Sequence, residues 1–179
     1  MRALVVYESM YGNTKEIAEA VADGLSTRMP VQLTEVGAAP TVLADDIGLL
    51  VVGAPTHAHG MSDRRSRTSA ADRVVEGEPP VVSRGVGLRD WLFGLEHGSS
   101  PAHVAAAAFD TRIKGPQLLW GSAAKRAEPH LKAAGAHVIA PAESFLIAGP
   151  RGPKYDSLIE GEVERAHRWG EQLATRIPG

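Results

Sequence analysis

The sequence lacks several features that whole classes of protein require. It contains no cysteine, which excludes disulfides, thiolate nucleophiles, iron–sulfur clusters and cysteine-based zinc sites. Its formal net charge is −2, so it lacks the surplus of positive charge that nucleic-acid binding needs. No apolar stretch approaches the roughly 20 residues that span a bilayer, and the apolar run at residues 3–7 is too short for a signal peptide. We therefore expect a cytoplasmic protein without membrane insertion and without a nucleic-acid partner.

What the chain does contain is typical of one globular domain. Its 179 residues suffice for one substantial core, and 44% of them are hydrophobic. Aromatic residues make up only 5%, so aliphatic side chains and alanine must supply most of that core. We expect a single domain over residues 1–179.

Hydrophobic periodicity divides the chain into alternating strands and helices. Strands are predicted at residues 3–7, 31–36, 49–53 and 103–109, and a last strand at 137–140 and 144–147 is interrupted by Pro141. Helices are predicted at residues 14–28, 87–95, 122–134 and 156–176. Such alternation predicts a parallel sheet joined by right-handed crossovers.

The character of each strand predicts its place in the sheet. The three continuous apolar runs suit central strands, whereas the alternating second run and the proline-interrupted last strand suit edges. The predicted fold class is therefore α/β: a three-layer sandwich whose five-stranded parallel sheet has the order 2-1-3-4-5, with helices on both faces.

One segment does not follow this alternation. Residues 62–85 show no clear period and are rich in arginine, so we expect a long surface loop with one helical turn at most. Arg64, Arg65 and Arg67 form a basic cluster within it. They either hold the phosphates of a nicotinamide donor or an acidic partner, or they are solvated surface.

In a sheet of this order, a crevice opens at the carboxyl ends of the strands, where the order reverses. Residues 8–13, 54–62 and 110–121 would surround it. In the first of these loops, Ser9, Asn13 and Thr14 supply short polar side chains, and Gly12 permits close backbone approach. Asn13 followed by Glu16 predicts a capping box at the next helix. The loop is either an anion site suited to a phosphate monoester or an ordinary capped turn.

The same loop carries a family resemblance. The run Ser9-Met10-Tyr11-Gly12-Asn13-Thr14 resembles the flavodoxin phosphate loop, Ser/Thr-x-Thr-Gly-x-Thr, with tyrosine in place of the second threonine. A tyrosine at this position more closely resembles the loop of the NAD(P)H:quinone reductases that share the fold. Residues 53–62 resemble the flavin-contacting loop after the third strand. The resemblance implies noncovalent FMN, with its phosphate on residues 9–14 and its ring between the second and third loops.

The candidate FMN-binding residues lie in these three loops. They are Ser9, Met10, Tyr11, Gly12, Asn13, Thr14, Pro55, Thr56, His57, Ala58, His59, Gly60, Asp110, Thr111, Arg112 and Trp120. We expect no catalytic residue of the protein's own and no metal, because the His57–His59 pair has no evident third ligand.

Several of these residues have two interpretations. His57 and His59 either exchange protons with a reduced flavin or are solvated loop histidines. Asp110 and Arg112 either contact the flavin's polar edge or a substrate, or they pair with each other or cap a turn. Trp120 either stacks on the flavin or anchors its loop to the core.

Two functions follow. The first is a flavodoxin-like redox protein that moves electrons through FMN, as a carrier or as an NAD(P)H-dependent reductase, with the near-neutral charge favouring the reductase or an unusual carrier. The second is a non-redox binding module of the same fold, which holds another phosphate-bearing ligand or no flavin.

Overall fold

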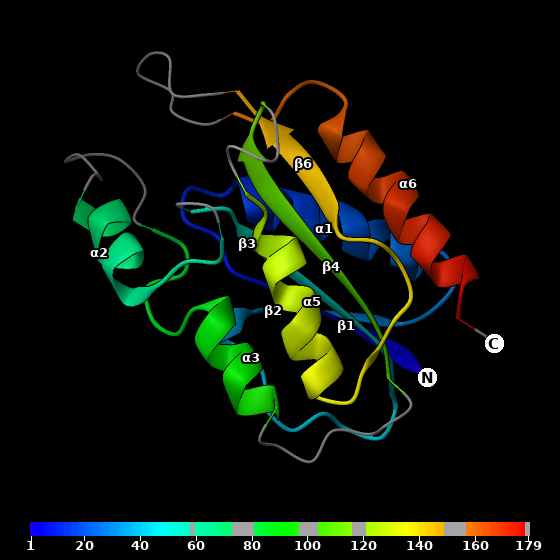
Figure 1. Ribbon diagram of the computed structural model, residues 1–179. Coiled ribbons are helices and arrows are strands. Elements are labelled where there is room, and N and C mark those ends of the chain that lie inside the picture. Colours follow the sequence, from blue (N-terminus) through cyan, green and yellow to red (C-terminus); the bar gives the residue numbers. More distant parts are fainter. Residues whose placement is uncertain (58–59, 73–80, 97–103, 116–120, 149–156, 178–179) are drawn as a thin grey trace.

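Figure 1 shows the computed structural model of the chain, which describes residues 1–57, 60–72, 81–96, 104–115, 121–148 and 157–177. The strands are β1 (Arg2–Tyr7), β2 (Val31–Glu35), β3 (Ile47–Pro55), β4 (Ala105–Ile113), β5 (His137–Val138) and β6 (Glu143–Ile147). The helices are α1 (Asn13–Ser26), the short 3-10 turn η1 (Val36–Ala38), α2 (Arg64–Asp72), α3 (Leu88–Glu96), α5 (Ala123–Ala133) and α6 (Glu162–Thr175).

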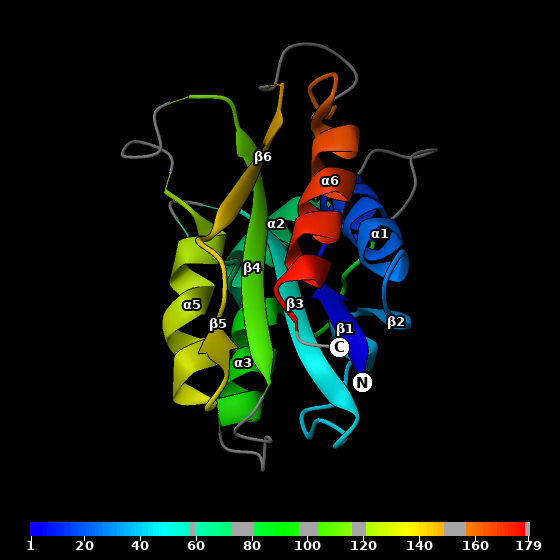
Figure 2. The ribbon, with the colours of Figure 1, turned by 90° about the vertical axis from the view of Figure 1, so that its right-hand side faces the viewer.

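The strands form one parallel sheet in the order β2-β1-β3-β4-β5, with β6 also paired to β4. Figure 2 shows the sheet between two helical layers, with α1 and α6 on one face and α3 and α5 on the other. The predicted α/β class, strand order and three-layer arrangement are confirmed. The last strand is divided into β5 and β6 on either side of Pro141, where the sequence predicted an interruption.

The central strands are buried on both sides, as their continuous apolar sequences predict. Leu4, Val6, Leu50 and Val52 pack into the core under α3 and α5. Val5 and Val51 point the opposite way, into the core under α1 and α6. This alternation, which follows from the two-residue period of a strand, lets one sheet fill both cores.

Helices α1 and α6 approach closely because each carries a glycine at their contact. A Cβ on Gly24 would lie 2.1 Å from the carbonyl oxygen of His167, and one on Gly170 would lie 2.3 Å from that of Val21. No side chain fits at either position, so the two backbones are in direct contact.

The last helix begins later than the sequence predicts. Residues 157–159 run beside β6, where the amide of Ile159 donates to Leu146 O at 2.9 Å, and α6 starts only at Glu162. The prediction of one helix over 156–176 was therefore wrong at its start. Gly161 separates the two conformations, since its φ of 85° lies in the left-handed region.

The arginine-rich segment also differs from the prediction, because it contains α2 rather than a loop with one turn. Asp63 begins this helix with a reciprocal cap: its carboxylate accepts from the Ser66 amide at 2.7 Å, and the Ser66 hydroxyl accepts from the Asp63 amide at 2.8 Å. Only Arg67 and Ala70 of α2 are buried. A helix with so narrow a buried face gives little hydrophobic period in the sequence.

Among the helices that the structure describes, none combines the length and apolar character needed to cross a membrane.

Candidate functional site

The three loops expected at the crevice follow β1, β3 and β4, which are neighbours in the sheet. All three therefore leave the sheet at its carboxyl edge. The first loop enters α1 through Gly12, which is the N-cap residue with φ 103°. The prediction that Asn13 caps the helix was wrong by one position, since Asn13 is already the first helical residue and Gly12 is the N-cap.

The helix start has the features of an anion site. A helix N-terminus presents N–H groups and a positive dipole end, and here the N-cap residue is a glycine, which has no side chain to accept from them. A Cβ built on Gly12 meets nothing within 4 Å, so the space beside the turn is open. By contrast, α5 is capped by Ser122, whose hydroxyl accepts from the Lys125 amide at 3.1 Å. The donor set and the open space fit a phosphate group at α1.

Two hydroxyls of the first loop are buried beneath this turn. Ser9 is fully buried, and its Oγ accepts from the Gly12 amide at 3.2 Å, which leaves the hydroxyl proton for another acceptor. The hydroxyls of Thr14 and Thr111 share a hydrogen bond of 2.7 Å. Thr111 lies in β4, so this bond joins the first loop to the strand that leads into the third.

The segment after α2 covers one side of the first loop. The Val82 amide donates to Met10 O at 3.0 Å, and the Ser83 amide donates to Ser9 O at 2.8 Å. The Ser83 hydroxyl in turn accepts from the Ser9 amide at 3.0 Å. Residues 81–83 therefore extend the backbone pairing of the loop, as a short added strand would.

Helix α2 closes the same side. Met10, Ala70 and Val81 form a small buried cluster, and the Tyr11 hydroxyl donates to Ala70 O at 3.1 Å. Tyr11 as a whole remains 44% exposed. The loop therefore has one side packed against the segment that follows β3.

Glu8, which the sequence analysis did not single out, is the anchor of this packing. Its fully buried carboxylate accepts from the Ser62 hydroxyl and, at 2.8 Å, from the Leu88 amide that begins α3. Burial raises the pKa of Glu8, and the bonds from Ser62 and Leu88 and the charge of Arg67 oppose that rise. The available signal was a lone carboxylate directly after the apolar run of the first strand.

Arg67 belongs to this network rather than to a free basic cluster. It is buried, donates to the Ser62 hydroxyl at 3.2 Å and forms an ion pair of 2.8 Å with Asp90. Arg64 and Arg65 are exposed on α2. The structure therefore separates Arg67 from its two neighbours, and the idea of three arginines acting together on one ligand was wrong.

The second loop is a tight hairpin. The backbones of His57 and Gly60 exchange hydrogen bonds of 2.8 and 2.9 Å. Ala58 and His59 lie outside the described residues. Thr56 precedes the hairpin, and its hydroxyl accepts from the Ala123 amide at 3.0 Å. Pro55 is the last residue of β3.

In the third loop, the Asp110 side chain is turned toward α5 and that of Arg112 toward the loop backbone. The buried carboxylate of Asp110 accepts from the Ser122 hydroxyl at 2.5 Å and from the Ala124 amide at 3.0 Å through Oδ2, while Oδ1 has no partner among the described residues. The Arg112 guanidinium donates to Gly115 O at 2.9 Å. Trp120 lies outside the described residues.

The structure thus brings together Ser9, Gly12, Thr14 and Thr111 at the start of α1, and Thr56 with Asp110 at the start of α5. No cluster of three or more histidine, aspartate or glutamate side chains suited to a metal occurs in the described part of the chain.

Comparison with known protein families gives one match. A family profile described as flavodoxin matches residues 5–172. No curated protein sequence matches at a significant level.

Solved structures give a similar result. A flavodoxin from the domain Archaea is 20% identical, with 98% of each chain covered and a TM-score of 0.62. Flavodoxin 2 from Bacillus cereus is 18% identical, with 99% of this chain and 100% of that chain covered and a TM-score of 0.66. The flavodiiron protein from Giardia intestinalis is 22% identical over 98% of this chain but only 36% of its own, with a TM-score of 0.59. At these identities the likeness shows the fold alone.

Proposed function

Because this chain belongs to the flavodoxin family, we propose that it binds FMN noncovalently at the carboxyl edge of the sheet and uses it to transfer electrons. Family membership supports the FMN-dependent redox function in general. The placement of the cofactor on this chain's residues, and the role as carrier or reductase, are the parts that we propose.

The observation that carries the proposal is the open space at the start of α1, where the N-cap residue is Gly12. A phosphate monoester there would accept hydrogen bonds from first-turn amides and from the Ser9 hydroxyl, whose own oxygen already accepts from Gly12. No lysine or arginine lies within residues 9–14. The charge of the phosphate would therefore be balanced by amides, hydroxyls and the helix dipole.

The remaining candidate residues fall into two groups. Tyr11, His57, Ala58, His59, Gly60 and Trp120 are proposed to lie against the ring, with residues 58–60 at its N5 edge. Thr56 and Asp110 are proposed to act indirectly, because both hold the N-terminus of α5 in place below the third loop. The Thr14–Thr111 bond would keep the first and third loops at a fixed separation.

FMN, when bound, supplies the redox chemistry, and the protein supplies binding, ring orientation and exclusion of water. Within this function, the net charge of −2 favours an NAD(P)H-dependent reductase over an electron carrier, since carrier flavodoxins are usually strongly acidic. NADPH oxidation by the FMN-loaded protein with a quinone acceptor separates the two roles: turnover indicates the reductase, and its absence indicates the carrier.

One observation favours a second candidate, a non-redox module that holds another phosphate-bearing ligand. The first loop is packed against residues 81–83 and α2, and its Ser9 and Thr14 side chains are buried. A small phosphate compound needs only the open space beside Gly12, whereas FMN also needs a ring site.

The spectrum of the purified protein tests the choice. We expect a yellow protein that releases FMN on denaturation, or a colourless one that becomes yellow with added FMN. A colourless protein that does not take up FMN favours the second candidate.

A further inference from the structure

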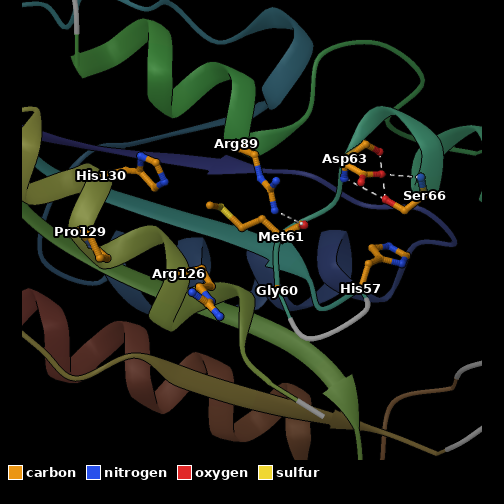
Figure 3. A pocket seen from close by; sticks show the side chains of 9 residues that line it. All are labelled: His57, Gly60, Met61, Asp63, Ser66, Arg89, Arg126, Pro129 and His130. Atoms are coloured by element: carbon orange, nitrogen blue, oxygen red, sulfur yellow. Dashed lines mark hydrogen bonds between the residues drawn. The ribbon is translucent and has the colours of Figure 1, made fainter.

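A cleft of about 600 Å³ opens beside the second loop, on the face of the sheet that α3 and α5 cover. Figure 3 shows that the hairpin residues His57 and Gly60 form one wall, while Arg89 of α3 and Arg126 of α5 come from two further sides. A Cβ on Gly60 would lie 3.5 Å from Arg126 Cγ, so the arginine stem rests on the hairpin. The proposed flavin site shares His57 and Gly60 with this cleft, but none of the functions assigned above uses Arg89, Arg126 or His130.

Two guanidinium groups give the cleft a positive charge. Arg89 donates to Met61 O at 3.0 Å, which holds the group at the cleft and leaves most of its N–H donors for a ligand. Arg126 has neither a hydrogen bond nor an ion pair from its side chain within the described part of the chain. Asp63 is the acidic residue of the lining, and its carboxylate is engaged by the Ser66 amide at 2.7 Å.

The rest of the lining suits a flat ring. His130 is held by its contact with Glu96, and Figure 3 shows the imidazoles of His130 and His57 at opposite ends of the cleft. Met61 and Pro129 add apolar surface. Imidazole rings and apolar side chains are surfaces on which bases stack, and the volume is in the range of small-molecule sites.

We propose that this cleft binds a phosphorylated nucleotide, with its phosphates between Arg89 and Arg126 and its base against His57 or His130. The arginine fork meets phosphate oxygens at two points, and two forks from separate helices suit a diphosphate better than a single carboxylate. NADPH is the member of this class that would serve the proposed reductase. Only this choice of nucleotide rests on the proposed function. The cleft itself needs no flavin.

Calorimetric titration of FMN-free protein with ADP, NADPH and inorganic pyrophosphate tests the proposal. Because no flavin is present, a failure here is distinct from a failure to bind FMN. We expect ADP and NADPH to bind more tightly than pyrophosphate, because only they carry a base. If NADPH bound more tightly than ADP, the dinucleotide would be identified as the preferred ligand. No binding of either nucleotide, or pyrophosphate binding as tight as that of ADP, would overturn the proposal.

Variants locate the binding. Arg126→Gln and Arg89→Gln should each weaken ADP binding at least tenfold, and Arg126→Lys should weaken it less, because it keeps the charge but loses the fork. Arg64→Gln and Arg65→Gln are matched controls, since they remove the same charge from exposed positions on α2 that do not line the cleft. Equal losses in the two pairs would show a general effect of charge and contradict the site. All four positions are exposed, so thermal unfolding should confirm intact folding.

Discussion

At the scale of single residues, the carboxyl edge of the sheet depends on one backbone conformation and one buried charge. Gly12 has a φ of 103° that keeps the start of α1 open. Glu8 lies four positions earlier and joins the same loop to the segment after β3. The first residue concerns ligand binding, and the second concerns the stability of the loop that would bind it.

Replacing Gly12 by valine should weaken FMN binding at least tenfold, about 1.4 kcal/mol. A branched side chain is strained at φ 103°, and it would project into the open space that we assign to the phosphate. Flavin fluorescence during an FMN titration measures the change.

The control for this variant is Gly135→Val. Gly135 also has a left-handed φ, 85°, with nothing within 4 Å of a built Cβ, but it follows the far end of α5. The Gly135→Val variant should lose about as much folding stability as Gly12→Val and keep its FMN affinity. If both variants lost affinity equally, the effect would be one of folding rather than of the phosphate site.

Glu8→Gln should change how stability depends on pH. Burial raises the Glu8 pKa above its ordinary value of 4.5, so the folded chain holds this proton more tightly than the unfolded chain. The free energy of unfolding of the wild type therefore falls as pH rises from 4.5 through the raised pKa, by up to about 1.4 kcal/mol per pH unit. Glutamine removes this decline. The free energy of unfolding of the variant should therefore rise relative to that of the wild type between pH 4.5 and the raised pKa.

Urea unfolding at a series of pH values measures the difference, with Glu160→Gln, at an exposed carboxylate, as the control. If the free energies of unfolding of Glu8→Gln and the wild type changed in parallel with pH across this window, the raised pKa of the buried carboxyl would be contradicted.

At the scale of elements, two kinds of contact position the site. Helices α1 and α6 meet backbone to backbone at Gly24 and Gly170, so no side chain separates them there. On the other side of the first loop, α2 and residues 81–83 dock by hydrogen bonds and by the cluster of Met10, Ala70 and Val81.

Gly170→Ala should destabilise the protein by about 1–3 kcal/mol, because the added methyl would lie 2.3 Å from Val21 O and must separate the helices. Gly94→Ala in α3 is the matched control, since its methyl meets only the Thr41 side chain, at 3.1 Å. In that helix, alanine should leave stability unchanged or raise it by up to about 1 kcal/mol. Thermal unfolding compares the two, and a Gly170→Ala midpoint at or above the wild-type value would rule out the tight contact.

The sequence predicts elements well where their pattern is local and poorly where distant contacts decide. Strand order followed from apolar runs that alternate with helices, and Pro141 marked the break in the last strand. Helix α2 was missed because Arg67 is buried only through its pairing with Asp90, which no local period reveals. Its Asp63–Ser66 cap was the one local signal.

The same distinction applies to the candidate site. The position of the first loop could be predicted from its residue types and its place after a strand. The role of Glu8 could not, because its partners Ser62 and Leu88 are 54 and 80 residues away. The N-cap was misplaced because Asn13 has the better capping side chain, whereas the turn requires the left-handed backbone of Gly12.

At the scale of the whole molecule, a parallel sheet of order β2-β1-β3-β4-β5 places three loops at one edge. Each loop is held by a different kind of contact. The first is tied to residues 81–83, the second is closed as a hairpin, and the third begins beside the capped α5. The central claim is that the first of these loops receives the phosphate of FMN.

Comparing the affinities of FMN and riboflavin for the cofactor-free wild-type protein tests that claim most directly. The two ligands share the isoalloxazine ring and differ only in the phosphate. We expect FMN to bind at least tenfold more tightly, about 1.4 kcal/mol or more, because the amides at the start of α1 and the Ser9 hydroxyl act only on the phosphate. Equal affinities, or no binding of FMN, would contradict it.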